Sequence, residues 1–576
     1  MMQDLFFGLA GGLGLFLFGF SLMGKGFQYL AGDKISCLLT RTSNPLMAMG
    51  TGFLMTLTLQ GAGAATVLLI SLFGSGLVRL KQGICILLGI NLGATVLVYL
   101  TSVQLGKYAF LAIGLGFLLF SCRKKRYTHY FGCTVLGFGL LFIGLNILTT
   151  AMQPLVEHLF ARGILTQQAI SPLYGYLLGF LFTALLQNNL ATIGVLQAFV
   201  RQVAISGQES PFLHLTAVLP FILGTGLGIC VTATLASVKD NILTKRAVWA
   251  HWLIIGTTTL GFLLLKGPLS QVVNGTTLWL WRSAGAAKEF IFSVPAGPLP
   301  TGARLLSKEI AMAHTIYNLL MVVIWLPLAG SFSSFLTERI TGSWRNQEEK
   351  TTDGEYLNER FFATPGIALR VAAKEILRTG EIAIDMLYFA KIAFFKGQSS
   401  AIKDIGKKED HVDALHAKVT LYLSTLLSKQ NILTANQSRY LTGLIHVVND
   451  VERIADHAEH IGEFAQAKLE EKLPFSQLAM DELALLYEKV LDICKKALVA
   501  LEADDPLLAK QVLEREMVID NIQKEMRQNH INRLNQGRCW PGSGIVYLEL
   551  IANLERVADH AANIGEVVLE GKEELI

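Results

Sequence analysis

The chain has 576 residues, of which 52% are hydrophobic and only 16% are charged. A water-facing surface needs more charge than this, so the composition excludes a disordered chain and an ordinary soluble enzyme. Residues 1–340 carry 21 Lys and Arg against 8 Asp and Glu, a net charge of +13, whereas the remainder carries 28 against 37, a net charge of −9. The overall charge of +4 combines two opposite halves and gives no sign of nucleic-acid binding. We expect an all-α protein with a transmembrane domain over 1–338, a polar linker over 339–355 and an acidic soluble helical domain over 356–576.

The first half is a series of apolar runs, most of them near or above the roughly 20 residues that a membrane-spanning helix needs. They cover residues 5–24, 42–78, 82–106, 127–156, 163–200, 210–238, 247–265 and 310–337, with a shorter run at 108–122. Backbone groups in a bilayer must be hydrogen-bonded within their own segment, so these runs predict helices. The basic cluster at 123–126 predicts a cytoplasmic loop because positive residues concentrate on that side.

Two of these runs are too long for one span, and each is interrupted near its middle. The interruptions are Gln60–Gly63 and Gln187–Asn189, which predict pairs of short helices that meet inside the membrane. They belong to an internal repeat, because GFLMTLTLQ at 52–60 matches GFLFTALLQ at 179–187 without a gap, and 89–95 is echoed by 224–230. A broken helix exposes N–H groups and a positive dipole end to an anion, and its freed carbonyls suit a small cation. The alternative interpretation is a set of close-packed helices rich in small residues.

Neither interruption has a Lys or Arg close to it. A dianion at the centre would be costly to desolvate unless cations accompanied it. We therefore expect an anion carrier of this design to be coupled to a cation.

The apolar half resembles the bacterial sodium/phosphate cotransporter family, which is related to the type II sodium-dependent phosphate transporters. The resemblance rests on segments 11–19, 30–33, 87–93, 250–251 and 314–318 and covers nearly all of 5–335. It implies two inverted repeats with re-entrant hairpins, inorganic phosphate as the substrate, Na⁺ as the coupling ion and a multi-pass location in the bacterial inner (plasma) membrane. The positions that match its substrate and sodium site are Gln60, Gly61, Ala62, Gly63, Thr66, Asn91, Thr95, Gln187, Asn188, Asn189 and Thr192.

Both hairpin tips depart from the family pattern. Where the family has Gln-Ser-Ser-Ser, this chain has Gln-Gly-Ala-Gly from Gln60 and Gln-Asn-Asn-Leu from Gln187, so all six motif serines are absent. Backbone N–H groups and the amides of Asn188 and Asn189 remain as donors. A site that loses several polar partners loses orders of magnitude in affinity. Three options stay open: phosphate held by backbone and amides, a different anion, or a domain that no longer transports.

Two histidines also match the family motifs. His314 and Asn318 are spaced i, i+4 on one helix face. We expect His314 and His251 to make interhelical hydrogen bonds rather than to act as direct ligands.

The second half has the long amphipathic pattern of a helical bundle. VERIADH at 451–457 recurs as LERVADH at 554–560, which predicts two three-helix repeats. Four carboxylate pairs at i, i+4 each share a helix face, and converging pairs from facing helices build metal sites in bundles. Arg453 and Arg556 offer the alternative of structural salt bridges. The pairs are Glu409/Asp413, Glu452/Asp456, Glu516/Asp520 and Glu555/Asp559.

This half resembles the phosphate-uptake regulator PhoU over about residues 356–570. The resemblance rests on the lead-in at 356–369, on DVER at 450–453 and on NLER at 553–556. It implies that the eight carboxylates bind a divalent or iron-type metal and that the C-terminal domain is cytoplasmic.

Together these features predict a sodium-coupled secondary transporter of inorganic phosphate with a PhoU-like regulatory domain. Its partners are membrane lipid and phosphate, and a homo-oligomer is left open. The alternatives are a membrane-anchored sensor of phosphate status and a carrier of another anion. The sequence has no phosphate-cradling P-loop, no HExxH and no nucleophile elbow, so we do not expect an enzyme.

Overall fold

The computed structural model describes residues 2–40, 44–102, 106–122, 125–162, 171–207, 210–238, 242–283, 301–340, 357–428 and 433–570. Within these ranges all regular structure is helical, which confirms the predicted all-α class. The chain divides into two compact units, Met1–Asn346 and Gln347–Ile576. The division falls inside the predicted linker, most of which lies outside the described residues, as do two residues of the predicted basic loop, 123–124.

Six stretches of the first unit are long and apolar enough to cross a membrane, judged by length and composition. Two further helices are α5 (Gly106–Ser121), at the predicted shorter run, and α12 (Lys266–Ser283), which the apolar runs did not include. A short 3₁₀ turn, η1, spans Pro211–Leu213. The six stretches lie in α1 (Met2–Thr40), α4 (Leu80–Ser102), α6 (Arg126–Ala151) with α7 (Gln153–Ala161), α10 (Leu215–Ala236), α11 (Ile242–Leu264) and α14 (Thr301–Arg339).

The two overlong apolar runs are each broken into a pair of short helices, as predicted. The first pair is α2 (Pro45–Leu59) and α3 (Ala62–Gly74), and the second is α8 (Pro172–Leu186) and α9 (Asn189–Ile205). Each first helix starts with Pro at its first position, where the missing N–H costs nothing.

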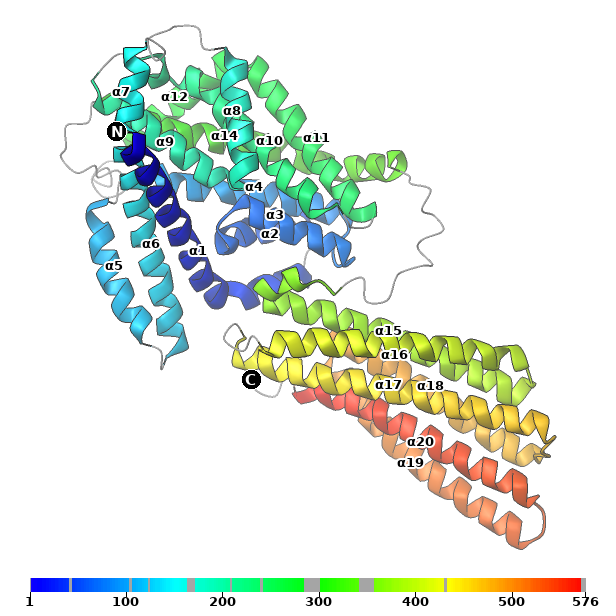
Figure 1. Cartoon of the computed structure of the whole chain (residues 1–576). Helices are drawn as coiled ribbons and strands as arrows, with labels where there is room; N and C mark the ends of the chain where they lie inside the picture. The colour runs from blue at the N-terminus through cyan, green and yellow to red at the C-terminus, as the bar shows by residue number, and fades with distance from the viewer. Residues whose placement is uncertain are drawn as a thin grey trace. The chain divides into compact units, whose positions relative to one another are not determined.

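The internal repeat of the sequence is also a repeat in packing. Helix α2 packs against α4, and α8 packs against α10. Gly52 and Gly89 allow the first pair to approach so closely that a Cβ at either would collide with a backbone carbonyl of the partner helix. Gly179 and Gly224, their equivalents in the second repeat, do the same between α8 and α10. Figure 1 shows α2 and α3 beside α4, and α8 beside α10.

The second unit consists of six long helices that run alongside one another after the short turn η2 (Glu359–Ala363) (Figure 1). Helices α15, α16 and α17 pack together, α18, α19 and α20 pack together, and the two groups meet through α17 and α20 and through α15 and α18. This arrangement is the predicted pair of three-helix repeats. The bounds are α15 (Pro365–Lys396), α16 (Ser399–Ser428), α17 (Ala435–Glu470), α18 (Gln477–Ala503), α19 (Pro506–Asn535) and α20 (Pro541–Glu570).

Candidate functional site

Both hairpins turn on a glutamine in a left-handed backbone conformation. Gln60 has φ 55° and ψ 39°, and Gln187 has φ 52° and ψ 24°. Non-glycine residues with positive φ are uncommon, and such strain gathers at functional sites. The same left-handed conformation occurs at the equivalent residue of both repeats, so the two helix breaks are a repeated feature of the fold.

The two hairpin tips lie in contact with each other. A Cβ added at Gly63 would lie 2.5 Å from the carbonyl oxygen of Gln187, and one added at Gly61 would lie 3.9 Å from the amide nitrogen of Asn188. The structure therefore brings together the predicted site residues of the two repeats, which are far apart in the sequence.

The two tips offer different hydrogen-bonding groups. Gly61 precedes helix α3 and provides no side-chain cap, and the first helical bond joins the Ala65 N–H to the Gly61 carbonyl at 3.1 Å. The N–H groups of Ala62 and Gly63 precede that bond, so they form an uncapped, positively polarised helix end. At the second tip, the Asn188 side-chain oxygen caps α9 by accepting from the N–H groups of Leu190 at 3.0 Å and Ala191 at 3.3 Å.

Several buried polar groups around the tips have no hydrogen-bond partner among the described residues. Gln60 is 4% exposed and packs against Gly24 of α1, yet both atoms of its amide are unpaired. The side-chain oxygens of Asn189 and Thr66 are also buried and unpaired. Leaving such groups unpaired costs about 1–3 kcal/mol each. Gln187, by contrast, has an exposed side chain.

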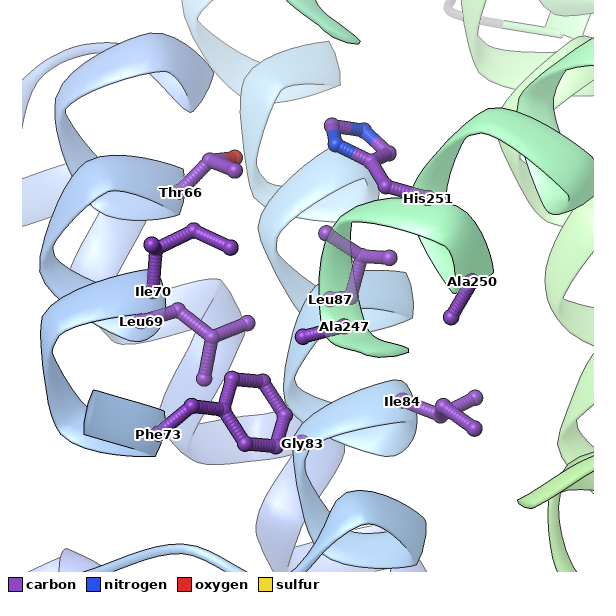
Figure 2. Close-up of a pocket in the computed structure, with 10 residues that line it drawn as sticks. All are labelled: Thr66, Leu69, Ile70, Phe73, Gly83, Ile84, Leu87, Ala247, Ala250 and His251. Carbon is purple, nitrogen blue, oxygen red and sulfur yellow. The ribbon is translucent and has the colours of Figure 1, made fainter. Parts of the chain in front are cut away.

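Thr66 and His251 face a small cavity between α3, α4 and α11 (Figure 2). Its volume is about 10 Å³, and its other walls are apolar side chains such as Leu69, Phe73 and Ile84. This is about the space that a single water-sized particle occupies. The cavity is too small for phosphate in this conformation.

The structure corrects the expected role of both histidines. Among the described residues, the hydrogen-bond partner of His314 lies on its own helix: the Asn318 amide contacts its ring at 3.2 Å and donates to its backbone carbonyl at 2.9 Å, all within α14. Their i, i+4 spacing brings them together on their own helix. His251 is 1% exposed, and neither ring nitrogen has a partner in the described part of the chain.

Three other predicted site residues bond within their own hairpin or helix. Asn91 donates to the Leu87 carbonyl at 3.0 Å, and Thr95 donates to the Leu92 carbonyl at 2.6 Å, both within α4. Thr192 donates to the Asn188 carbonyl at 3.1 Å and accepts from the Thr183 hydroxyl at 3.0 Å. These contacts satisfy them without a ligand.

Arg201 is a buried cation that the analysis of the hairpin breaks missed. It lies near the C-terminal end of α9 and is 4% exposed. Its guanidinium donates to the carbonyls of Thr101 at 3.0 Å and Ser102 at 3.2 Å, which end α4, and to the Ser307 hydroxyl of α14 at 3.3 Å. The sequence did indicate this residue, since Arg201 is a single arginine directly after the apolar run 163–200. Its hydrogen bonds join α9 to α4 and α14.

In the second unit the eight predicted carboxylates form two acidic clusters. The first acidic cluster joins Glu409 and Asp413 of α16 to Glu452 and Asp456 of α17. Burial and the charges of Asp413 and Glu459 raise the pKa of Glu409 to about 7. Burial and Asp456 raise the pKa of Glu452, and Asp413 adds to the effect across the helices.

The second acidic cluster joins Glu516 and Asp520 of α19 to Glu555 and Asp559 of α20. Burial and the charges of Asp559 and Asp520 raise the pKa of both glutamates. Lys524 forms an ion pair with Asp520 at 2.6 Å.

Concentrated carboxylates that repel one another have the donor chemistry of a cation site. Arg453 and Arg556 are exposed, and in the part of the chain that the structure describes neither forms an ion pair with the clusters. Nor are three or more His, Cys, Asp or Glu side chains gathered there closely enough to hold an ion. The carboxylates are the kind of donors that bind a metal, but in this structure their side chains are too far from one another to hold one. Metal binding therefore stays a prediction.

Two residues of the predicted metal motifs have a different role between the repeats. Asp450 accepts a hydrogen bond from the His560 ring at 2.9 Å, and Asn553 contacts the His457 ring at 2.8 Å. The two rings stack with centroids 5.7 Å apart. This crossed arrangement joins α17 to α20, and the repeated DH dipeptide was its sequence signal.

Both parts of the chain are similar to known proteins. Residues 15–150 match the family model described as Na⁺/Pi-cotransporter, and residues 376–465 and 483–568 match the PhoU domain. A protein named "Putative inorganic phosphate export protein YjbB" from Escherichia coli (strain K12) is 23% identical over 572 residues, which are 98% of each chain. "Uncharacterized protein YqeW" from Bacillus subtilis (strain 168) is 24% identical over 318 residues, covering 55% of this chain and 92% of that protein. The crystal structure of PhoU from Pseudomonas aeruginosa is 21% identical, with a TM-score of 0.34, over 35% of this chain and 96% of that one.

Proposed function

We propose that this chain, which joins a Na⁺/Pi-cotransporter domain to a PhoU domain, is a secondary carrier that moves inorganic phosphate across the bacterial inner membrane without converting it chemically. A relative that matches over 98% of both chains is named "Putative inorganic phosphate export protein YjbB", so we assign export as the direction. We further assign Na⁺ as the coupling ion and a cytoplasmic location to the PhoU domain.

The observation that carries the proposal is the contact between the two hairpin tips. Gly63 lies against the Gln187 carbonyl, and the uncapped start of α3 lies at the same place. The free N–H groups suit an anion, and the carbonyl suits a cation that accompanies it. Neither hairpin break has a Lys or Arg close to it in the sequence, so an accompanying cation would offset the cost of desolvating phosphate.

The closed state of the site agrees with alternating access. The cavity of about 10 Å³ beside Thr66 has space for a dehydrated cation and none for phosphate. Phosphate binding therefore requires the hairpins to separate, which is the motion that repeat-based carriers use.

In the PhoU domain, the carboxylates of the two acidic clusters would hold the metal. A bound metal would supply positive charge that offsets their mutual repulsion. By binding carboxylates of neighbouring helices, the metal would link α16 to α17 and α19 to α20 and would stiffen each repeat. We propose that this unit regulates the carrier.

Flux of labelled phosphate in proteoliposomes tests the proposal. Purified protein is reconstituted with a sodium gradient in either direction, and Gln60→Met is compared with the exposed control Gln271→Met. We expect Gln60→Met to lose phosphate flux and to gain thermal stability, because an unpaired buried amide is replaced by an apolar group of similar length. Flux equal to that of the control would place the site elsewhere.

The second candidate function is a sensor of phosphate status, favoured by the absence of the six motif serines and by the closed cavity. It predicts no flux above that of empty vesicles from folded protein in any gradient. Flux that requires the gradient would exclude a pure sensor.

The location of the PhoU domain is tested with its cysteine. Cys539 is partly exposed, and a membrane-impermeant maleimide should label it in broken cells and not in intact ones if this domain is cytoplasmic. Labelling in intact cells would reverse the assigned topology.

A further inference from the structure

The second unit contains a cavity that lies apart from both acidic clusters. It lies between the α17–α18 connection and the α19–α20 connection, and its volume is about 310 Å³. Small-molecule sites begin at about this size. Its walls include Phe475, His530, Arg538, Trp540, Ser543 and Tyr547.

Two buried polar side chains in this wall lack partners. His530 is 2% exposed and Ser543 is 6% exposed, and neither the His530 Nε2 atom nor the Ser543 hydroxyl has a hydrogen-bond partner among the described residues. A Cβ placed at Gly544 would lie 2.9 Å from His530 Nε2, which puts that nitrogen beside the first turn of α20. Unpaired buried groups of this kind are unfavourable, and a bound ligand would satisfy them.

The same wall contains the start of α20, a helix of 30 residues. Its first helical bond joins the Gly544 N–H to the Trp540 carbonyl at 3.0 Å, so the N–H groups of Gly542 and Ser543 precede that bond. The indole nitrogen of Trp540 lies close to Gly542 as well, 3.4 Å from the position of an added Cβ.

The equivalent helix of the other repeat satisfies its own start. At α17, the Thr434 hydroxyl accepts from the Gln437 N–H, and the Gln437 side chain accepts from the Thr434 N–H, which forms a capping box. The sequence Trp-Pro-Gly-Ser-Gly at 540–544 provides no such pair. Of these two equivalent helices, α17 has its first N–H groups capped by its own side chains, whereas the first N–H groups of α20 are available to a ligand.

The charges around the cavity favour an anion. Arg538 is exposed, and its guanidinium makes no ion pair within the described ranges. The nearby carboxylate of Glu482 is already occupied, because Arg533 donates to it at 2.9 and 2.7 Å and Tyr547 donates to it at 2.5 Å. Burial and the charge of Arg533 lower the pKa of His530, an effect that a bound anion would oppose.

We propose that this cavity binds a small anion that carries a phosphate group. Gly542, Ser543, His530 and Arg538 would hold the phosphate oxygens. The rings of Phe475, Trp540 and Tyr547 would cover the remaining space, which suits a phosphate ester with a flat or apolar substituent as well as free phosphate. The proposal does not depend on whether the membrane domain transports phosphate.

Protection of Cys539 tests the proposal on the full chain in detergent. Cys539 lines the cavity and is partly exposed, and Cys122 in the first unit is exposed and serves as an internal control. The rate of maleimide labelling at each cysteine is followed by peptide mass spectrometry with inorganic phosphate, phenyl phosphate or sodium chloride at matched ionic strength. We expect labelling of Cys539, and not of Cys122, to slow towards zero as the phosphate compound saturates the site.

The variant Arg538→Ala sharpens the test because its side chain is exposed and its loss leaves the helices intact. We expect the concentration for half protection to rise about tenfold or more, since hydrogen bonds to charged groups contribute about 1.5–3 kcal/mol. The exposed Arg527→Ala on α19 is the matched control and should not change it. Gly544→Ala, which crowds His530, should also weaken protection.

The outcomes separate the sources of the phosphate group. Protection by inorganic phosphate assigns a site for the free ion, and protection by phenyl phosphate alone assigns a site for phosphate esters. Protection of neither kind, or protection that sodium chloride reproduces or that Arg538→Ala leaves unchanged, overturns the proposal.

Discussion

The contact between the two hairpin tips can be tested with a single methyl group. In Gly63→Ala the added Cβ would lie 2.5 Å from the Gln187 carbonyl oxygen, and both sides of this contact are backbone. A carbon and a carbonyl oxygen approach to about 3.3 Å at the closest, so the tips must separate by about 0.8 Å. Gly50→Ala is the matched control, because it lies in α2 of the same hairpin and an added Cβ there meets nothing within 4 Å.

The expected magnitude follows from two opposing effects. Replacing Gly by Ala inside a helix stabilises it by up to about 1 kcal/mol, and this gain is shared by both variants. Overpacking at the tip costs about 1–3 kcal/mol and applies to Gly63→Ala alone. Displacing binding groups by about 1 Å can lower a rate by on the order of 10²-fold, so phosphate flux should fall by up to this factor.

The assay compares the two variants by thermal unfolding in detergent and by phosphate flux in proteoliposomes. Gly50→Ala should unfold at the same temperature as the parent chain or above it and keep its flux. Gly63→Ala should unfold at a lower temperature than the control and lose most of its flux. Equal stability and equal flux in both variants would refute the apposition of the tips.

Three further variants test other parts of the structure. Arg201→Met should destabilise the first unit by about 1–3 kcal/mol for each carbonyl at the end of α4 that loses its donor, seen as earlier thermal unfolding than in the exposed control Arg79→Met. Under the proposed metal sites, replacing Glu452 by Gln together with Asp456 by Asn should lower the bound metal by the share of the first acidic cluster, and unchanged metal content by elemental analysis would show that these carboxylates form only a charged surface. Burial raises the pKa of Glu482, but hydrogen bonds from Arg533 and Tyr547 outweigh it and lower that pKa, so the stabilisation is present above about pH 4.3 and is lost as the pH falls through the lowered value. Arg533→Met should flatten this acid dependence of unfolding, and an unchanged pH profile would show that the pair contributes nothing.

The fold could be predicted where a physical constraint acts along the sequence itself. Runs 42–78 and 163–200 exceed one membrane span, and their matching glutamines mark where the helices break. The constraint fails for α12 (Lys266–Ser283), because its Ser, Gln, Asn and Thr residues interrupt the apolar pattern on which the prediction relied.

The hydrogen-bond partner of each site residue could not be predicted, because a sequence shows which donors and acceptors are present but not which of them pair in the fold. Asn188 and Asn189 are the same residue type, yet the oxygen of the first caps α9 and that of the second is buried and unpaired. His314 was expected to bond across helices and instead bonds to Asn318 on its own helix. The cavity at the start of α20 could not be predicted from the internal repeat, because it lies where the sequences of the two repeats differ.

The two hairpin tips are unlike each other in the groups that they present. At the first tip Gln60 is followed by Gly and Ala residues, so the start of α3 has no side-chain cap and its N–H groups stay available. The second tip uses Asn188 to cap α9, so its donors are occupied and the group that it turns towards Gly63 is the Gln187 carbonyl. In the proposed site, the first repeat would supply the donors for an anion and the second would supply the acceptor for a cation. The two repeats would therefore divide between them the two binding roles that identical tips would share.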